Sequence, residues 1–372
     1  MSSSSHSSCP TTRPLQRHRQ LLDDGRDPLI GRFLDQKFRI IQRIGHGAYG
    51  SVYRAEQMAL HRDVAIKVLD AGGTAEPDLA ERFNREACAV SRVHHPNIVS
   101  IFDFGRTDDG LLFLAMEYIH GVTLTELVAC AAPLPLAQAI DLIAQVAMAL
   151  EAIHAAGLVH ADLKSDNLLV QPLPRGQLVK VVDFGIARWL EPAGAGGEDS
   201  VHGPAPDTTA VDGDEVAIAP HVRGTPGYIA PEVIRGAAPT QTADVYAAGV
   251  VLHLLLTGEL PFVGRHPGET LRRQLVAPVL PPSLTRPDVP ELLDDLVLRA
   301  TARDPGARYA DATELRCAIE AAAVELAPGS IPYGGSTYGL YDASGFEPAP
   351  RARTEDTGDS LYHTTTTTDV SV

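Results

Sequence analysis

The sequence has only four cysteines and no C-x-x-C pair among them. Cys9, Cys88, Cys130 and Cys317 are scattered along the 372 residues, which argues against a disulfide framework and against a structural zinc site. Such cysteine usage is typical of a reducing compartment. We therefore expect a cytoplasmic protein.

Long apolar runs are also missing. The longest, residues 245–256, is about 12 residues long and contains His253, whereas a membrane-spanning helix needs about 18 or more. The first residues of the chain are polar and contain no hydrophobic signal-peptide core. These features predict a protein without a membrane span.

Positive charge is scarce, because 31 Lys and Arg stand against 47 Asp and Glu, for a net charge of −16. This charge repels phosphate backbones and anionic lipids, so we expect no nucleic-acid partner. Residues 191–220 hold seven of the acids and no Lys or Arg, and residues 325–372 hold seven more. Both segments contain too few apolar residues to form a core and are predicted to be disordered.

The length fits one two-lobed unit or two domains. Residues 1–35 are rich in Ser and then in Arg, and residues 326–372 are of low complexity. We predict that both ends are disordered. The folded domain is expected to span residues 38–325, with residues 191–220 as an acidic insert.

The two halves of this domain have different patterns. The first half predicts a small antiparallel sheet and one helix, with β-prone runs at 38–45, 51–57, 63–70, 98–105 and 111–119 and apolar residues at helical spacing over 78–93. The second half is rich in Ala and Leu and predicts helices, with short strands at 167–170 and 178–182. Thr123 and Glu126 have the spacing of a capping box at the start of a helix.

A glycine-rich motif lies between the first two predicted strands. It has the spacing G-x-G-x-x-G and reads Gly45-His46-Gly47-Ala48-Tyr49-Gly50. A dinucleotide-binding motif of this type leads into a helix, whereas this one leads into a second strand. A hairpin that folds over phosphates is therefore favoured. An ordinary glycine-rich hairpin remains the alternative.

Three further motifs carry charged groups suited to phosphoryl transfer. Lys67 lies in the apolar strand V-A-I-K and needs an anionic partner, for which Glu86 on the next helix is the candidate. Residues 160–167 read H-A-D-L-K-S-D-N and supply Asp162, Lys164 and Asn167. Asp183, in D-F-G, adds a second metal-binding carboxylate.

Together these motifs resemble the protein kinases, and specifically the eukaryotic-like serine/threonine kinases of bacteria. The resemblance covers residues 38–325 and implies an α+β, bilobed fold. It implies an N-lobe at 38–119 with five antiparallel strands and one main helix, and a mainly helical C-lobe at 120–325. It also implies that ATP and Mg²⁺ bind in the cleft and that protein Ser and Thr hydroxyls are the acceptors.

The resemblance assigns roles to individual residues. It implies that Asp162 is the catalytic base, with Lys164, Lys67, Glu86 and Thr225 in the catalytic set, and that Asn167 and Asp183 bind the metal. It implies that ATP is held by the glycine-rich loop, by the strand that carries Lys67, and by the hinge after the gatekeeper Met116. The ATP-binding residues are Ile44, Gly45, His46, Gly47, Ala48, Tyr49, Gly50, Ser51, Val52, Ala65, Lys67, Glu117 and Ile119.

Structural anchors and two departures from the family pattern also follow from the resemblance. Residues 224–232, G-T-P-G-Y-I-A-P-E, look like a substrate-positioning segment, Asp244 like an anchor of the catalytic loop, and Arg308 like the partner of Glu232. The usual arginine before the catalytic aspartate is Ala161 here, so an activation-loop phosphate lacks its usual partner. Residues 186–229 make a loop longer than usual, and the acidic insert accounts for the excess.

Two other functions remain open. A pseudokinase scaffold would use the same fold without catalysis. A small-molecule phosphotransferase would share the H-x-D-x-x-x-x-N logic but would lack the segment at 224–232. A homodimer that phosphorylates itself in trans is a further hypothesis.

Overall fold

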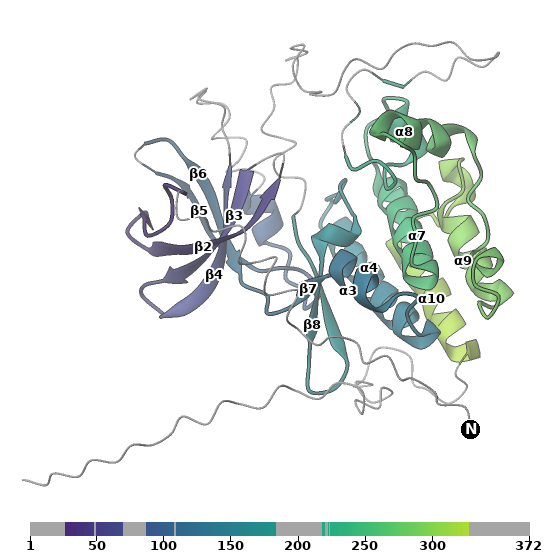
Figure 1. The fold of residues 1–372 in the computed structure, drawn as a ribbon, viewed down its shortest axis with the longest axis horizontal. Helices are drawn as coiled ribbons and strands as arrows, with labels where there is room; N and C mark the ends of the chain where they lie inside the picture. Colours follow the sequence, from purple (N-terminus) through teal and green to yellow (C-terminus); the bar gives the residue numbers. More distant parts are fainter. Residues whose placement is uncertain are drawn as a thin grey trace, which may run out of the picture.

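The computed structural model describes residues 27–47, 50–69, 87–107, 109–183, 218–219, 222 and 224–326. Within these ranges the chain forms an antiparallel sheet followed by a mainly helical part, as Figure 1 shows. This is the two-lobed α+β architecture expected from the sequence. Several parts of the chain lie outside the described residues: Ala48, Tyr49, Glu86, the terminal segments 1–26 and 327–372, and nearly all of the acidic insert.

The first part is a six-stranded sheet in the order β1-β2-β3-β4-β6-β5. Its strands are β1 (Phe33–Leu34), β2 (Phe38–Gly47), β3 (Gly50–Gln57), β4 (Arg62–Leu69), β5 (Ile101–Arg106) and β6 (Leu112–Glu117). Alternation in β4 sends Val64, Ile66 and Val68 into one core and Ala65 and Leu69 into another. Lys67 is two residues from both Ala65 and Leu69, so it lies on their face of the strand.

The folded part begins earlier than the sequence indicated. Residues 27–35 were expected to be disordered, yet β1 pairs with β2 and Leu34 is fully buried against Phe38 and Ile40. The Asp27 carboxylate accepts hydrogen bonds from Arg43 and from the Tyr53 hydroxyl, at 3.2 and 3.0 Å. The expected five strands are therefore six. The sequence does not predict this segment, because its strand has only two residues and its hydrogen bonds to Arg43 and Tyr53 come from a single aspartate.

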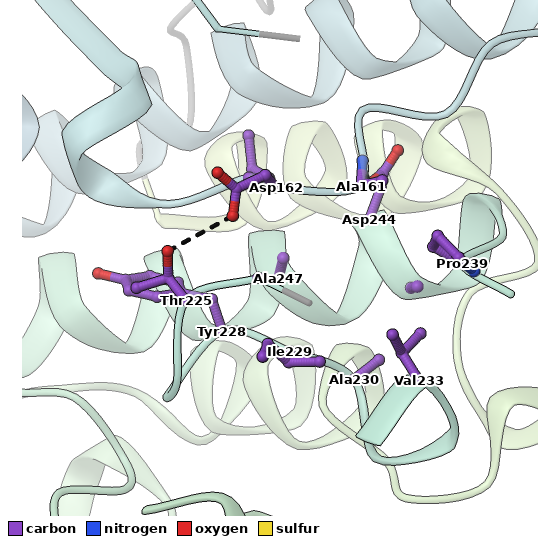
Figure 2. A pocket seen from close by; sticks show the side chains of 13 residues that line it. Ala161, Asp162, Thr225, Tyr228, Ile229, Ala230, Val233, Pro239, Asp244 and Ala247 are labelled. Atoms are coloured by element: carbon purple, nitrogen blue, oxygen red, sulfur yellow. Dashed lines mark hydrogen bonds between the residues drawn. The ribbon is translucent and has the colours of Figure 1, made fainter. Parts of the chain in front are cut away.

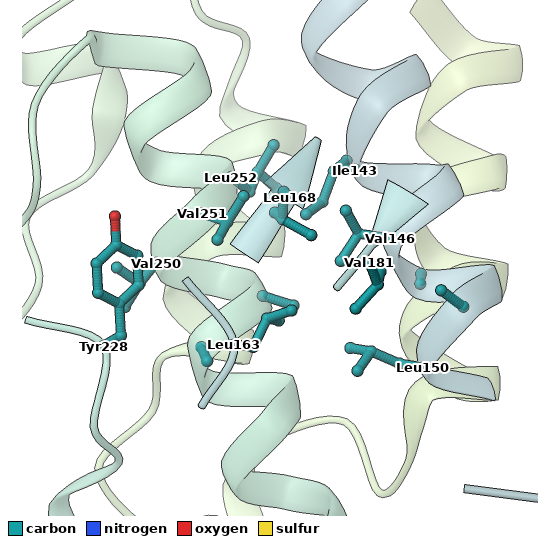
Figure 3. Packing of buried hydrophobic residues seen from close by; sticks show 14 of the residues in the cluster. Ile143, Val146, Leu150, Leu163, Leu168, Val181, Tyr228, Val250, Val251 and Leu252 are labelled. Carbon is teal, nitrogen blue, oxygen red and sulfur yellow. The ribbon is translucent and has the colours of Figure 1, made fainter. Parts of the chain in front are cut away.

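The second part is built around two long helices, α4 (Leu136–Ala155) and α7 (Gln241–Thr257). In α7, all residues from Ala243 to Thr257 are buried, as expected of a helix at the centre of a core. The other elements are α3 (Leu124–Ala131), η1 (Ser165–Asn167), α6 (Pro231–Ile234), α8 (Pro267–Val276), η2 (Pro282–Leu284), α9 (Glu291–Ala300), η3 (Pro305–Ala307) and α10 (Ala312–Leu326). Figure 3 shows Ile143, Val146 and Leu150 of α4 facing Leu168 and Val181 beside α7.

Local signals placed the edges of several elements correctly. Thr123 caps α3, and both hydrogen bonds of its capping box with Glu126 are present. The three-stranded sheet β7-β8-β9 consists of Val122–Thr123, Leu168–Pro172 and Gln177–Val181, close to the two strands expected there. By length and composition α4 is apolar enough to cross a membrane, but 61% of its apolar window is buried inside the protein. It is therefore explained as a core helix.

The loop before β5 attaches the sheet to the helical part. The Asn97 side-chain amide donates to Gln145 Oε1 on α4 and to the Val179 carbonyl oxygen on β9, each at 2.9 Å. Ile98 forms a parallel bridge with Val181. All of these groups are buried, so the two parts have a fixed contact.

We expect Leu34→Ala to destabilise the protein by about 2–5 kcal/mol, because it removes a fully buried side chain from the smaller core. Phe33 lies next to it on the same strand and is 50% exposed, so Phe33→Ala is the matched control and should have a much smaller effect. Thermal unfolding of both variants tests this. Equal effects would show that β1 does not contribute to the core.

Candidate active site

The Lys67 side chain, on β4 of the sheet, binds a carboxylate from the other part of the protein. Its Nζ is 2.6 Å from Asp183 Oδ1, and it is largely buried. Asp183 lies two residues after the end of β9 and has a φ of 60°, a backbone conformation that non-glycine residues seldom adopt. The structure thus brings together two residues that are 116 positions apart in sequence. Glu86, the partner expected for Lys67, lies outside the described residues.

Asp162 and Lys164, on the loop between α4 and β8, meet Thr225 of the segment at 224–232. Lys164 Nζ donates to Thr225 Oγ1 at 2.8 Å and lies 3.2 Å from Asp162 Oδ2. The Thr225 hydroxyl donates to Asp162 Oδ1 at 3.4 Å, the bond drawn in Figure 2. A carboxylate, an ammonium and a hydroxyl from the substrate-positioning segment therefore share one site.

Asn167 and Asp183 are held beside this group by the backbone. The Val182 N–H donates to the Asn167 carbonyl oxygen at 2.9 Å. Asp183 is the next residue in the chain, so this bond holds it near Asn167. The Asn167 side-chain nitrogen donates to the Asp162 carbonyl oxygen at 2.8 Å, which leaves the amide oxygen as the ligand atom. Among the described residues no group of three or more His, Cys, Asp or Glu could hold a metal by itself. One carboxylate and one amide oxygen fit Mg²⁺, which usually takes its other ligands from phosphates and water.

The glycine-rich motif is the hairpin between β2 and β3. Gly45 pairs with Val52, His46 with Ser51 and Gly47 with Gly50. Gly50 has a φ of 135°, and a Cβ there would lie 2.0 Å from the Val68 carbonyl oxygen, so only glycine fits. The described part of the motif, with Ile44 preceding it, therefore consists of the two paired strands expected on either side of a phosphate-covering loop.

The hinge begins at Glu117, the last residue of β6, and this residue forms a charged pair that the sequence did not reveal. Glu117 Oε2 accepts a 2.9 Å hydrogen bond from Lys180 Nζ, and Lys180 is itself buried in β9. Ala65 pairs with Met116 across β4 and β6, and both are buried, as is Ile119. The only sequence signal for Lys180 was a lysine inside the β-prone run at 178–182.

A buried carboxylate on α7 fixes the backbone of the catalytic loop, defined as residues 160–167. Asp244 is 1% exposed, and its two oxygens accept hydrogen bonds from the backbone N–H groups of His160 and Ala161, at 2.8 and 2.9 Å. His154 Nε2 lies 2.9 Å from the same carboxylate. Asp244 thus holds the loop two residues before Asp162.

The substrate-positioning segment has its own anchors. Glu232 forms a two-bond ion pair with the buried Arg308, with distances of 2.8 and 2.6 Å, as the sequence resemblance implied. The Tyr228 hydroxyl lies 2.8 Å from Ser165 Oγ in the catalytic loop. Burial raises the pKa of Tyr228 above its ordinary value of 10.0, so the hydroxyl that makes this contact is even harder to ionise.

Ala161 occupies the position of the arginine that the family usually has. Its φ is 62°, and its methyl group borders the small pocket beneath Asp162 that Figure 2 shows. A methyl group cannot donate a hydrogen bond to a phosphate. The structure therefore offers no arginine at this position of the loop.

Comparisons with known proteins agree with this geometry. Residues 38–317 match the family described as "Protein kinase domain". Serine/threonine-protein kinase pkn3 of Myxococcus xanthus is 36% identical over 298 residues, which make up 79% of this chain and 51% of that protein. PrkC of Bacillus subtilis is 34% identical over 294 residues, 79% of this chain and 42% of that protein. The chain thus spans about half, or less, of the length of these curated relatives.

The fold is similar to solved structures as well. The crystal structure of the Mycobacterium tuberculosis PknI kinase domain aligns with a TM-score of 0.57 and 27% sequence identity. The alignment covers 78% of this chain and 97% of that domain.

We expect Asp244→Ala to loosen the catalytic loop, because it leaves two backbone donors buried without an acceptor, at about 1–3 kcal/mol each. Hydrogen exchange at the His160 and Ala161 amides should become faster, and the melting temperature should fall. Asp295→Ala, which removes an exposed aspartate from α9, is the control and should change neither. Unchanged exchange in Asp244→Ala would contradict this role.

Proposed function

The chain belongs to the protein kinase family, and on this premise we propose that it transfers the γ-phosphoryl group of ATP to Ser or Thr hydroxyls of proteins. The observation that carries the proposal is the meeting of Asp162, Lys164 and Thr225 beside the Lys67–Asp183 pair. Phosphoryl transfer depends on positioning and on charge stabilisation more than on covalent chemistry. These groups supply both.

Each residue has a defined task in this proposal. Asp162 orients the acceptor hydroxyl and takes its proton, while Lys164 stabilises the negative charge on the transferred group. Lys67 holds the α- and β-phosphates, and the hairpin at Gly45–Gly50 covers them with backbone N–H groups. Glu117 and Ile119 contact the adenine from the hinge.

Mg²⁺ fits the oxygen donors of Asn167 and Asp183, and when bound it would neutralise charge on the phosphates. The Lys67 ammonium lies at Asp183 Oδ1, so it would share that carboxylate with the metal. Asn167 is oriented by its bond to the Asp162 backbone. The catalytic loop thus ties the position of the metal to the position of the base.

The Lys164–Thr225 bond supports Ser and Thr as acceptors. The resemblance to serine/threonine kinases rests on a lysine two residues after the catalytic aspartate together with a threonine in the substrate-positioning segment. Here these two side chains are in direct contact at 2.8 Å. The cytoplasmic location and the homodimer remain predictions.

The pseudokinase alternative requires that these residues do not perform chemistry. We expect Lys67→Met and Asp162→Asn each to reduce transfer by about 10³-fold or more, because each removes transition-state stabilisation. Both variants should keep the melting temperature of the wild type within a few degrees. Incubation with [γ-³²P]ATP, Mg²⁺ and an acceptor such as casein measures the rate.

Transfer by purified Asp162→Asn at the wild-type rate would refute the catalytic assignment. A wild-type protein that shows neither transfer nor an ATP-dependent thermal shift would favour the scaffold.

Regulation should differ from that of kinases that have the arginine. Ala161 cannot form the charge-assisted bonds by which arginine holds a phosphate, and the insert at 191–220 already carries seven acids. Phosphatase-treated and untreated enzyme should therefore have similar kcat. Thr208→Ala/Thr209→Ala should be tolerated, whereas Thr225→Ala should lose activity. A large loss after dephosphorylation would show that another basic residue replaces the missing arginine.

A further inference from the structure

Gln274 is a buried polar residue that the catalytic motifs do not include. It lies on α8, is 1% exposed, and points its side-chain amide at the substrate-positioning segment. Its Oε1 accepts a 2.9 Å hydrogen bond from the Gly227 N–H, and its Nε2 donates a 2.8 Å bond to the Ile229 carbonyl oxygen. One side chain thus pairs two backbone groups on either side of Tyr228.

These backbone groups need an external partner. Gly227 has a φ of 99°, so the chain turns sharply there and the segment is not part of a helix or a strand. A buried N–H or C=O without a partner costs about 1–3 kcal/mol. Gln274 satisfies the N–H group of Gly227, two residues after Thr225, and the carbonyl group of Ile229, four residues after it.

The helix that carries Gln274 is itself fixed on both sides of its first turn. His266 caps the Glu269 N–H, and Thr270 Oγ1 accepts from the Gly264 N–H at 2.9 Å. Glu269 bonds to both Arg265 and Arg273 at 2.8–3.0 Å. Leu275, next to Gln274, is buried in the main core. The amide therefore comes from a helix that is anchored in the core at the next residue.

We infer that Gln274 is a positioning residue that sets the substrate-positioning segment so that the Thr225 hydroxyl reaches Asp162 and Lys164. This inference rests on the proposed kinase function. ATP would bind on the other side of the catalytic loop, against Lys67 and the hinge. Gln274 should therefore control the use of the protein substrate and leave ATP binding unchanged.

The surroundings of Gln274 allow it to be replaced without overpacking. A cavity of about 280 Å³ lies beside it, bordered by Phe262, Val279 and Leu298. Methionine has nearly the length of glutamine and no strong hydrogen-bonding group, so Gln274→Met removes both bonds. When its side chain is ionised, Gln274→Glu keeps an acceptor for the Gly227 N–H but has no donor for the Ile229 carbonyl oxygen.

The two variants make different predictions for hydrogen exchange. Exchange of the Gly227 amide should become about ten-fold faster in Gln274→Met, because its acceptor is gone, and should stay close to the wild-type rate in Gln274→Glu. This measurement does not depend on catalysis. Equal protection of Gly227 in the wild type and in Gln274→Met would overturn the inference.

Steady-state kinetics then test the link to substrate. Gln274→Met should raise KM for casein or lower its kcat/KM by about ten-fold, with KM for ATP unchanged. Hydrolysis of ATP by water, which needs no protein acceptor, should also be retained. Parallel changes in both KM values would contradict the positioning role.

Gln145→Met is the matched control. Gln145 is also 1% exposed, and its amide bonds to Asn97, Val179, Asp141 and Gln177, away from the substrate-positioning segment. It should lower the melting temperature without a selective effect on casein or on Gly227 exchange. If the wild type transferred no phosphate, the kinase proposal would fail, while the exchange experiment would still decide whether Gln274 holds the segment.

Discussion

The hydrogen bonds between the Asp244 carboxylate and the catalytic loop are the interaction on which the site depends most. It lies inside α7, where water cannot solvate it, and a buried charge of this kind is tolerated only when it is fully hydrogen-bonded. The His160 and Ala161 N–H groups and His154 provide those bonds. The central helix of the core and the catalytic loop therefore stabilise each other. Asp162, Lys164 and Asn167 follow the two anchored residues along the chain, so their backbone starts from a fixed position.

Two polar contacts extend this rigidity across the cleft. Asn97 reaches Gln145 and β9 from the loop before β5, and Lys180 of β9 reaches Glu117 at the hinge. Both contacts end on β9, the strand that leads into Asp183. The position of Asp183 relative to Lys67 is thus set from the hinge and from α4 as well as by the direct ion pair.

Most of the residues that the structure brings together at the candidate site were indicated by the sequence, because they fall in short motifs with fixed spacing. Thr123 and Glu126 marked a helix start for the same local reason. Gln274 and Lys180 were missed because their roles depend on partners distant in sequence, a buried backbone turn and a hinge carboxylate. Strand β1 was missed because it has only two residues. A glutamine inside an amphipathic helix has no local feature that distinguishes it from a surface residue.

Alanine at position 161, in place of the arginine that the family usually has, keeps the backbone of the catalytic loop but not its phosphate-binding side chain. Its φ of 62° is unfavourable for an L-residue by about 1–2 kcal/mol, so something must hold the backbone there. The hydrogen bond from its N–H to Asp244 does so from within the core, at 2.9 Å. The side chain takes no part in that bond. Alanine therefore preserves the shape of the loop. It lacks the guanidinium group through which a phosphate on the activation loop could act on the catalytic loop. The geometry of the site is thus kept, while control by such a phosphate loses its usual contact.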